Sequence, residues 1–275
     1  MPNYLVQILL STYNGASYIK EQLNSILEQD TQEWQLLIRD DGSSDETMKI
    51  VADYVTKYPQ KIVLLEGGEG GNASRSFMTM LANSDAPYIM FCDQDDVWKP
   101  DKIKNSLKEI KLLEKKNPIA LVYSDMTVVD RNLNMKHSSF LAHQRLKPSW
   151  SNYVYACFAQ SMAAGCSMIF TRALVEIMHP IKAPLFQHDH WVLMHASNYG
   201  VVKFLDQSTM LYRQHTQNAV GSHEIDLGYF TRKIAEFKKI VARWRYIKIY
   251  FRPKVSLYKI LFAKFWINTY RLLKI

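Results

Sequence analysis

The sequence predicts an α/β fold in which a mostly parallel sheet carries helices on both faces. Short apolar runs of strand length alternate along the chain with stretches whose apolar residues recur at helical spacing. The 275 residues are also 48% hydrophobic, which is enough to fill a core between such layers. Strands that alternate with helices are expected to run parallel, because each connection crosses back over the sheet.

The first half of the chain repeats a strand, a loop and a helix. Its predicted strands are Val6–Leu10, Trp34–Ile38, Ile62–Leu65 and Tyr88–Cys92. Its predicted helices carry apolar residues at Ile19, Leu23, Ile26 and Leu27, then at Met48, Val51, Val55 and Tyr58, and then within Ser74–Leu81. Ser43 and Glu46 have the spacing of a capping box, which would begin the second helix.

The second half begins with a helix from Pro100 to about Lys116. Apolar runs then predict strands at Ile119–Tyr123, Gly165–Phe170 and Val201–Leu205, with a further segment at Met126–Val129. Short helices are expected at Leu174–Met178 and Trp191–Ser197. The polar stretch from His137 to Trp150 is expected to be irregular.

Polar clusters follow each of the first four predicted strands. They are Thr12-Tyr13-Asn14, Asp40-Asp41, Gly70-Gly71-Asn72 and Asp93 to Asp96. Each cluster alone has a structural alternative, because Asp-Asp-Gly is a good turn and an aspartate is a good helix cap. Four such clusters at the carboxyl ends of successive strands indicate a ligand site, since the loops of a parallel sheet meet at that edge.

Three carboxylates are crowded at the end of the fourth predicted strand, in the segment FCDQDDVWKP. Asp93, Asp95 and Asp96 fall within four positions. Like charges that share a site raise each other's pKa unless a positive group relieves them. A bound cation is the expected partner.

The basic residues are concentrated at the end of the chain. The net charge is +8, and the last 47 residues, 229–275, hold 13 of the 34 Lys and Arg but 1 of the 26 acids. The preceding residues therefore carry a net charge of −4. This distribution predicts a mildly acidic body, residues 1–228, and a basic tail, residues 229–275.

Helical spacing in the tail predicts two basic amphipathic helices separated near Pro253. The predicted apolar stripes are Phe230, Ile234, Phe237, Ile240 and Val241 in the first helix, and Leu257, Ile260, Leu261 and Phe265 in the second. Stretches without Lys or Arg are far shorter than the roughly 18 to 20 apolar residues that span a bilayer. We expect the tail to dock on an anionic membrane surface. Packing of the apolar stripes on protein is the alternative.

The cysteines and the N-terminus predict a cytoplasmic protein. Cys92, Cys157 and Cys166 are an odd number without metal-type spacing, so buried thiols in a reducing compartment are expected rather than disulfides. The first residues lack the basic region and cleavage-like site of a signal peptide. Together with the basic tail, these features predict a peripheral protein at the inner face of the cell membrane.

Five segments carry a resemblance to a known family. In this order and spacing, they resemble the family 2 inverting glycosyltransferases with the GT-A fold, and most closely their bacterial rhamnosyltransferase-like branch. The segments are STYNG, LLIRDDGSSDET, YIMFCDQDDVW, QHDHW and LYRQHTQN. The resemblance covers roughly residues 4 to 221. It implies a catalytic domain at 1–228, with a nucleotide-binding half at about 1–98 and an acceptor half at about 99–228.

The resemblance implies roles for the nucleotide-binding half. The nucleotide base and ribose would be held by Thr12, Tyr13, Asn14, Asp40 and Asp41. Core packing is the alternative for the Tyr13 ring. Gly71 and Asn72 would lie close to the donor, because glycine permits close approach. Asp95 would be the main ligand of Mg²⁺ or Mn²⁺, Asp93 would contact the metal or the donor, and Asp96 would support them.

The resemblance also implies the residues of the transfer step. Asp189 would be the catalytic base that takes the proton of the acceptor hydroxyl. Arg213 could pair with donor phosphates and His215 could bind the metal, in a loop that closes over the diphosphate. A zinc site built from His188, Asp189 and His190 is the alternative for that segment.

The implied activity is transfer of one sugar per encounter, since the Gln-x-x-Arg-Trp element of processive synthases is absent from the sequence. The donor would be a nucleotide-sugar, with dTDP-rhamnose as a candidate, and the acceptor a saccharide on a lipid carrier in cell-surface polysaccharide synthesis. A UDP-hexose or UDP-N-acetylhexosamine donor is the alternative within the fold. Binding of nucleic acid through the basic tail, or a scaffold role, is the non-enzymatic alternative.

Overall fold

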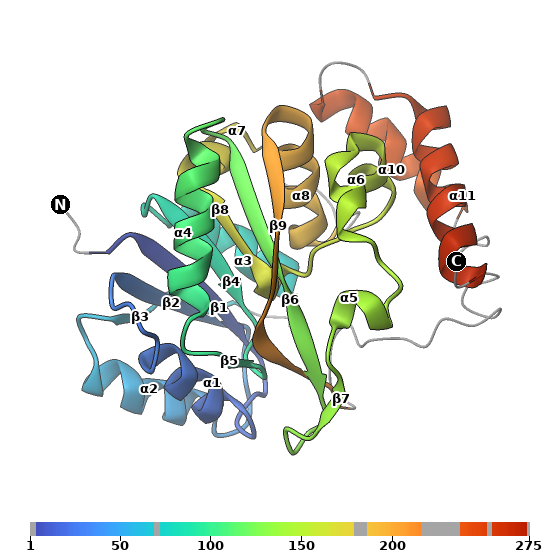
Figure 1. Cartoon of the computed structure of the whole chain (residues 1–275). Helices are drawn as coiled ribbons and strands as arrows, with labels where there is room; N and C mark the ends of the chain where they lie inside the picture. Colours follow the sequence, from blue (N-terminus) through green and yellow to red (C-terminus); the bar gives the residue numbers. More distant parts are fainter. Residues whose placement is uncertain (1–3, 69–71, 179–185, 216–236, 252–254, 274–275) are drawn as a thin grey trace.

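The computed structural model describes residues 4–68, 72–178, 186–215, 237–251 and 255–273 (Figure 1). The strands of its first half are β1 (Val6–Thr12), β2 (Trp34–Asp40), β3 (Ile62–Leu64), β4 (Tyr88–Cys92) and β5 (Val97–Trp98). The helices between them are α1 (Ile19–Leu27), α2 (Thr47–Lys57) and α3 (Ala73–Ala82). Each predicted strand and helix of this half is confirmed, and the two-residue strand β5 is additional.

The second half contains more short elements than its apolar pattern predicts. In order they are α4 (Lys102–Glu114), β6 (Ala120–Val129), β7 (Met135–His137), α5 (Phe140–His143), a 3-10 turn (Pro148–Asn152), α6 (Val154–Ala159), a second 3-10 turn (Gly165–Ser167), β8 (Met168–Thr171), α7 (Arg172–Ile177), α8 (His188–Tyr199) and β9 (Val201–Arg213). The tail contributes α10 (Phe237–Tyr250) and α11 (Leu257–Leu273).

The described strands form one nine-stranded sheet of order β3-β2-β1-β4-β8-β6-β9-β5, with β7 paired to β6. The pairs β1–β2, β1–β4, β2–β3 and β6–β9 are parallel. The strand β8 is antiparallel to both β4 and β6, so it joins two parallel halves. The α/β fold with a curled, mostly parallel sheet is confirmed, and β5 and β7 add antiparallel pairs at its margins.

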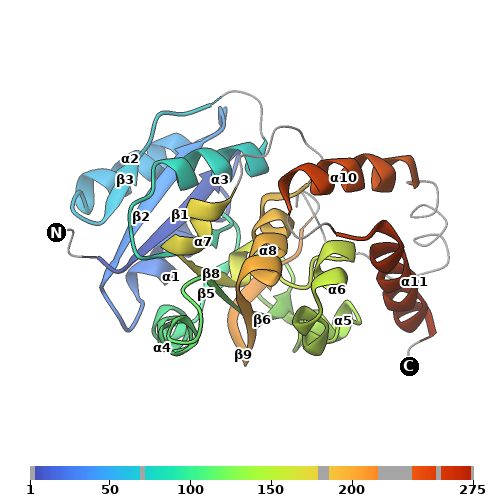
Figure 2. The same ribbon diagram turned by 90° about the horizontal axis from the view of Figure 1, so that it is seen from above.

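Alternating side chains of β1 build the two layers of the core. Ile8 and Leu10 pack with the apolar faces of α1, α2 and α4 on one side of the sheet. Leu9 points the other way and packs with α3, α7 and α8. This period of two is the expected pattern for a strand covered on both faces. Figures 1 and 2 show the helices in these two layers.

Several predicted boundaries in the second half are wrong. The runs at Ile119–Tyr123 and Met126–Val129 belong to one strand, β6. Ser124 and Asp125 between them both pair with β9, and a shift in register separates the two pairs. The strand predicted to end at Leu205 continues to Arg213. Gly165–Ser167 is a 3-10 turn rather than the start of β8. The stretch from His137 to Trp150 includes α5, and α6 follows it.

The predicted capping box of α2 does not form. The N-cap residue is Glu46, and its side chain makes no capping hydrogen bond. Ser43 instead donates to Asp40 Oδ1 at 2.6 Å. Asp45 Oδ1 accepts from the Thr47 backbone N–H at 3.0 Å, so a local aspartate turn begins this helix. Ser43 therefore belongs to the loop after β2, and the Ser-x-x-Glu spacing does not cap α2.

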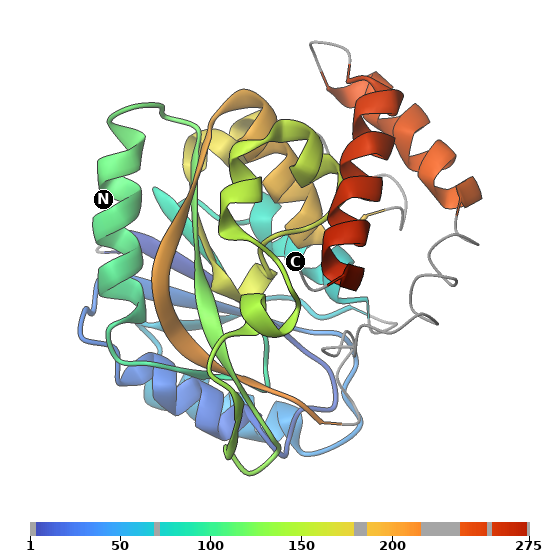
Figure 3. The same ribbon diagram turned by 45° about the vertical axis from the view of Figure 1, so that its right-hand side comes forward.

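The tail helices pack on the second half of the chain through one face. Ile247, Phe251, Val255 and Ile260 are buried with Phe158 of α6 and with Trp191 of α8. Figure 3 shows α10 and α11 beside these helices. This face of the tail helices therefore packs on protein, which was the alternative to membrane docking. Phe265 was predicted on the same stripe as Ile260, but it is 70% exposed. The predicted boundary between 228 and 229, and Phe230 and Ile234, lie outside the described residues.

None of the helices in the described ranges is long and apolar enough to cross a bilayer. The three cysteines are free and buried.

Candidate active site

The predicted site residues gather where β1, β2 and β4 end, beside the start of α8 and the end of β9. These strand ends lie at one edge because β1 pairs in parallel with both β2 and β4. Thr12 and Asp40 are direct partners in the parallel register. Sequence positions that are 28 residues apart are thereby brought into contact.

Thr12 and Asp40 form the interior of the first loop. The Thr12 hydroxyl donates to Asp40 Oδ1 at 2.7 Å, and the backbone N–H groups of Gly42 and Ser43 donate to Asp40 Oδ2 at 3.0 and 2.8 Å. Thr12 is fully buried and Asp40 is 6% exposed. In this arrangement both side chains shape the loop, and their direct contact with a nucleotide stays a prediction.

Tyr13 and Asn14 lie on the outside of the same loop. The Tyr13 side chain is 49% exposed, so the core-packing alternative is wrong. Gln94 holds the backbone of Tyr13 from both sides, with hydrogen bonds of 2.9 Å to its N–H and its carbonyl. Asn14 has a positive φ of 46°, and its Oδ1 accepts from the Ser44 N–H at 2.8 Å. The ring of Tyr13 is therefore presented to solvent by a braced backbone.

Asp41 is engaged by a buried arginine. Arg39 Nη1 lies 2.5 Å from Asp41 Oδ1, and the Ser76 hydroxyl of α3 bridges the two groups. Gly68 lies against Arg39, since a side chain at this position would begin 2.0 Å from Arg39 Nη2. Glycine leaves room there for the Arg39 guanidinium, and the sequence did not indicate this contact.

A cavity of about 350 Å³ lies next to this network. Its lining includes Asp40, Gly42, Leu64, Gly67 and Gly68, at the ends of β2 and β3. It is large enough for a planar ring of nucleobase size, because small-molecule pockets start at roughly 300 Å³. Of the two residues predicted to approach the donor here, Gly71 lies outside the described residues. Asn72 is the exposed N-cap of α3, and its Oδ1 accepts from the Arg75 N–H at 3.1 Å.

The carboxylates after β4 lie in a different environment. Burial, together with the charge of Asp95, raises the pKa of Asp93 to about 7. Burial and the charges of Asp95 and Asp93 raise the pKa of Asp96 well above its usual value. One oxygen of Asp96 accepts from the Arg213 N–H at 3.0 Å, but the other is buried and has no hydrogen-bond partner in the described part of the chain. These groups are short of positive partners.

His215 lies in contact with Asp95, and both residues were predicted to bind the metal. Its Nε2 is 2.8 Å from Asp95 Oδ2, although 120 residues separate them. The imidazole stacks on Tyr18 with ring centroids 4.5 Å apart. Tyr18 was not identified from the sequence, and its position just before α1 carried no signal for this contact.

Arg213 makes structural contacts rather than facing open space. Its Nε donates to the Asp95 carbonyl and its Nη1 to the Arg131 carbonyl, both at 2.8 Å, while Nη2 pairs with Glu21. The guanidinium also lies over the Tyr18 ring, 4.9 Å from its centroid. Arg213 thus ties the end of β9 to the acidic segment. Its predicted pairing with donor phosphates stays a prediction.

Lys102 is a fully buried cation behind the acidic segment. Its Nζ donates to the Cys166 carbonyl at 3.0 Å and to Thr209 Oγ1 at 3.2 Å. Burial lowers the pKa of Lys102 to about 8, against an opposing contribution from Asp96. The sequence analysis missed this residue, because a lysine in the first turn of a helix is ordinarily exposed.

Asp189 lies in the first turn of α8. Burial raises its pKa to about 6, although the N–H groups of His190 and Gly165 donate to it. Asp189 accepts from the N–H of Gly165, and the next residue, Cys166, has its thiol within 4.8 Å of a ligand atom of Asp93, so the two carboxylates lie on either side of this turn. The charge of Asp189 also contributes to the raised pKa of Asp93. A side chain at Gly165 would begin 2.8 Å from His188 Nε2 and 3.4 Å from Asp189 Cβ. The glycine therefore permits the approach of the loop to α8.

The histidines on either side of Asp189 have separate surroundings. The His188 ring stacks on Phe77 with centroids 4.2 Å apart, and burial lowers its pKa to about 3. His190 Nε2 lies 2.7 Å from the Cys157 carbonyl, and burial lowers its pKa to about 4. The two rings do not converge with Asp189 on one point in the described structure. The zinc alternative is therefore wrong.

The acidic segment has the chemistry of a divalent-cation site. Ligand atoms of Asp93, Asp96 and Cys166 lie within 4.8 Å of one another, and Asp95 with His215 adjoins them. The orphaned oxygen of Asp96 and the raised pKa values fit a site that is completed by positive charge. Carboxylate oxygens suit Mg²⁺ or Mn²⁺. Burial keeps the Cys166 thiol pKa well above its usual value, so the carboxylates are the better ligands.

Two curated proteins resemble the chain over most of their length. One is "dTDP-rhamnosyl transferase RfbG" of Shigella flexneri, 29% identical over 226 residues, which are 78% of this chain and 74% of that protein. Another is "UDP-Glc:alpha-D-GlcNAc-diphosphoundecaprenol beta-1,3-glucosyltransferase WfgD" of Escherichia coli, 26% identical over 194 residues, which are 70% and 69% of the two chains.

Two solved structures share the fold. The S. aureus TarS 1-349 complex with UDP-GlcNAc has a TM-score of 0.64 at 16% identity and covers 96% of this chain and 72% of that one. A mannosyltransferase of Pyrobaculum calidifontis, in complex with GDP-Man and Mn²⁺, has a TM-score of 0.64 at 18% identity and covers 98% and 72%. The chain thus has a GT-A architecture, with its acidic segment and Asp189 at the sheet edge where ligands bind.

The family comparison covers the first part of this site, whereas Asp189, Arg213 and His215 lie beyond the matched residues. The model of "Glycosyl transferase family 2" matches residues 7–174, from β1 to α7, which include the first loop, the β2 end and the acidic segment. With the named relatives and the shared fold, this match shows that the chain belongs to glycosyl transferase family 2 and is a nucleotide-sugar glycosyltransferase.

Proposed function

We propose that this glycosyltransferase depends on a divalent cation and moves one sugar, with inversion, to an acceptor hydroxyl. The observation that carries the proposal is that the acidic segment after β4 lies close to Asp189 at the start of α8. The acidic segment Asp93 to Asp96 would hold the metal diphosphate, and Asp189 accepts from the N–H of Gly165, whose neighbour Cys166 has its thiol within 4.8 Å of a ligand atom of Asp93. A base on one side of the sugar and a diphosphate on the other is what an in-line displacement needs.

The protein would use its own groups in three ways. Asp95, Asp93 and His215 would hold Mg²⁺ or Mn²⁺, which when bound neutralises charge on the departing diphosphate. Asp189 would accept the proton of the acceptor hydroxyl, and its pKa of about 6 suits a base that works near neutrality. Arg213 would act as a positioning residue that holds the acidic segment in place.

The nucleotide would lie over the ends of β1 to β3. The exposed Tyr13 ring can cover a base, and the cavity beside Asp40 and Gly68 can receive its edge. Thr12, Asn14, Asp40 and Asp41 would fix the loops that surround it. Gly71 and Asn72 stay candidates for close contact with the donor.

The relatives support a donor and an acceptor class. RfbG is named for dTDP-rhamnose, so dTDP-rhamnose is the first donor we propose. A UDP-hexose or UDP-N-acetylhexosamine is the second candidate, because WfgD is named for UDP-Glc and TarS was solved with UDP-GlcNAc. The name of WfgD includes a diphosphoundecaprenol acceptor, which supports a saccharide on a lipid carrier in polysaccharide synthesis.

We also propose that the tail places the enzyme at the cytoplasmic face of an anionic membrane. The outer face of α11 carries apolar side chains that the protein leaves exposed. Tyr258 is 83% exposed, Phe262 72% and Phe265 70%. Lys259, on the same helix, is exposed as well. Aromatic side chains with nearby cations are typical of helices that lie in the interface of an anionic bilayer.

The catalytic proposal is tested by a nucleotide-sugar screen with the purified full chain. Slow hydrolysis without acceptor identifies the donor by release of its nucleoside diphosphate. We expect release from one donor in Mn²⁺ or Mg²⁺ and none in excess chelator. Equal release with chelator would contradict the metal assignment.

The membrane proposal is tested by sedimentation with anionic liposomes at low salt. Phe262→Ser with Phe265→Ser should release the protein, because each exposed ring contributes inserted apolar area. Met135→Ser is the matched control, since Met135 is 69% exposed on β7 in the body. Binding that is unchanged by the double substitution would remove this role from α11.

A further inference from the structure

A cavity between the tail and the body lies directly behind the proposed catalytic base. Its volume is about 70 Å³, and its lining comes from α6, α8, α10 and α11. His190, the residue after Asp189, is part of the lining. The first turn of α8 therefore contributes to both sites, with Asp189 near the acidic segment and His190 in the cavity.

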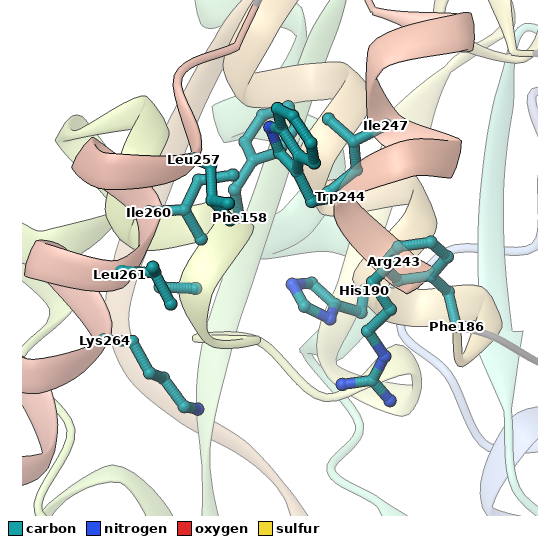
Figure 4. Close-up of a pocket in the computed structure, with 11 residues that line it drawn as sticks. Phe158, Phe186, His190, Arg243, Trp244, Ile247, Leu257, Ile260, Leu261 and Lys264 are labelled. Atoms are coloured by element: carbon teal, nitrogen blue, oxygen red, sulfur yellow. The ribbon is translucent and has the colours of Figure 1, made fainter. Parts of the chain in front are cut away.

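The cavity has one apolar side and one cationic side. Figure 4 shows the polar ends of Arg243 and Lys264 below His190, while Leu257, Ile260 and Trp244 lie above it. The charges of Arg243 and Lys264 both act on His190, where they add to burial in lowering its pKa. The lining includes no carboxylate. The cavity thus combines positive potential with apolar walls.

These features restrict the class of ligand. A carboxylate or phosphate would be favoured by the two cations, and a hydrocarbon segment by the apolar walls. At about 70 Å³ the cavity is far smaller than the roughly 300 Å³ of a pocket that encloses a small molecule, so it can take only part of a ligand. A nucleotide base and ribose would also need polar partners that the apolar walls do not supply.

We propose that this cavity binds the junction between the phosphate and the first prenyl unit of a lipid-linked acceptor. The phosphate would lie at Arg243 and Lys264, and the chain would leave along the apolar walls formed by α10 and α11. The saccharide beyond the phosphate would then extend past His190 toward Asp189. This inference rests on the proposed function, because it places the acceptor of that reaction.

The contacts of the two cations suit such a role. Lys264 Nζ donates to Gln160 Oε1 at 2.9 Å, and the Arg243 guanidinium lies 5.6 Å from the centroid of Phe186. The amide of Gln160 and the face of Phe186 thus position these two side chains at the cavity. The tail helices lie outside residues 7–174, which the family model matches, whereas Phe158 and Ala159 of the lining lie within them.

The test is binding of geranyl diphosphate to the full chain in chelator, measured by calorimetry and by tryptophan fluorescence, since Trp244 lines the cavity. Chelator prevents a metal in the acidic segment from holding the diphosphate. Geranyl diphosphate should bind more tightly than inorganic diphosphate or geraniol. Arg243→Gln with Lys264→Gln should weaken it by about tenfold or more, as expected for lost charge-assisted hydrogen bonds.

The matched control is Arg245→Gln with Lys108→Gln, which removes the same charge from exposed positions of α10 and α4 outside the lining. It should bind as the natural chain does. Ala159→Leu gives a test that leaves charge unchanged, because Ala159 lines the cavity and added bulk should reduce its volume and the affinity. Equal weakening in the control, or natural affinity in both lining variants, would overturn the proposal.

Hydrolysis of the nucleotide-sugar by the natural chain is measured separately and does not need an acceptor. If no donor is hydrolysed but geranyl diphosphate binds as described, the catalytic proposal fails and the lipid site stands. If a donor is hydrolysed but inorganic diphosphate binds as tightly as geranyl diphosphate, the lipid site fails alone.

Discussion

Two neighbouring groups of aspartates at the same sheet edge have opposite surroundings. At the ends of β1 and β2, Asp40 accepts hydrogen bonds from Thr12, Gly42 and Ser43, and Asp41 is paired with Arg39. At the end of β4, Asp96 retains a buried oxygen without a partner, and the pKa of Asp93 is raised to about 7. Carboxylates that are satisfied by protein groups shape loops. Those left short of partners are suited to bind a cation or a proton.

Substitution of the proposed base should have the largest effect on activity. Asp189→Asn keeps the size of the side chain but cannot accept the acceptor's proton, so transfer should fall by about 10² to 10⁴-fold. Donor affinity, measured by calorimetry, should be retained. Asp53→Asn, on the exposed face of α2, is the control. Near-normal transfer by Asp189→Asn would remove this residue from the role.

Removal of the proposed metal ligand should abolish the response to cations. Asp95→Ala leaves His215 without its carboxylate partner and should lose most turnover. In the natural chain, Mn²⁺ at about 100 times its dissociation constant should add about 2.7 kcal/mol of stability, which thermal unfolding detects. The variant should show a much smaller shift. A full shift in Asp95→Ala would assign the metal to other groups.

The two aspartate groups should respond oppositely when a charge is removed from metal-free protein at pH 8. Asp40→Asn should lower the free energy of unfolding by about 1 to 3 kcal/mol, because an amide cannot accept all the hydrogen bonds of the carboxylate. Asp93 has a folded pKa above its unfolded value, so its stabilising contribution is present at low pH and is lost as the pH rises through about 7. Asp93→Asn should therefore raise stability at pH 8.

The check is urea unfolding of both variants at pH 8 in chelator, followed by circular dichroism. The gain for Asp93→Asn should shrink at pH 5, where the natural side chain is largely protonated in the folded state. Loss of stability in both variants at pH 8, by similar amounts, would mean that the contrast between the two groups has no energetic consequence.

The transfer rate should depend on pH through Asp189. Its ionised form accepts the proton, and its pKa is about 6, so the rate should rise with pH up to about 6 and level off above it. Below that point the rate should fall by about tenfold per pH unit. The profile of kcat at saturating metal and donor gives the measurement. A rate that is constant from pH 5 to 8 would contradict this titration.

The sequence by itself determined the elements whose signals are local. Apolar runs and helical spacing placed β1 to β4, α1 to α4 and both tail helices, because strands and helices have fixed side-chain periods. The three carboxylates after β4 were evident from their crowding. With the resemblance to the family, this was enough to identify Asp93, Asp95 and Asp189 as site candidates.

Only the tertiary structure decided which of these residues meet and which are already engaged. His215 reaches Asp95 because β9 continues to Arg213, eight residues beyond its predicted end. The helix α11 presents Ile260 to the body and Phe265 to the outside, although both were predicted on one stripe. Contacts across the chain depend on how layers pack and on where bulges and turns redirect the backbone. Local periodicity holds no information about that, which is why the roles of Lys102, Tyr18 and Gly68 came only from the structure.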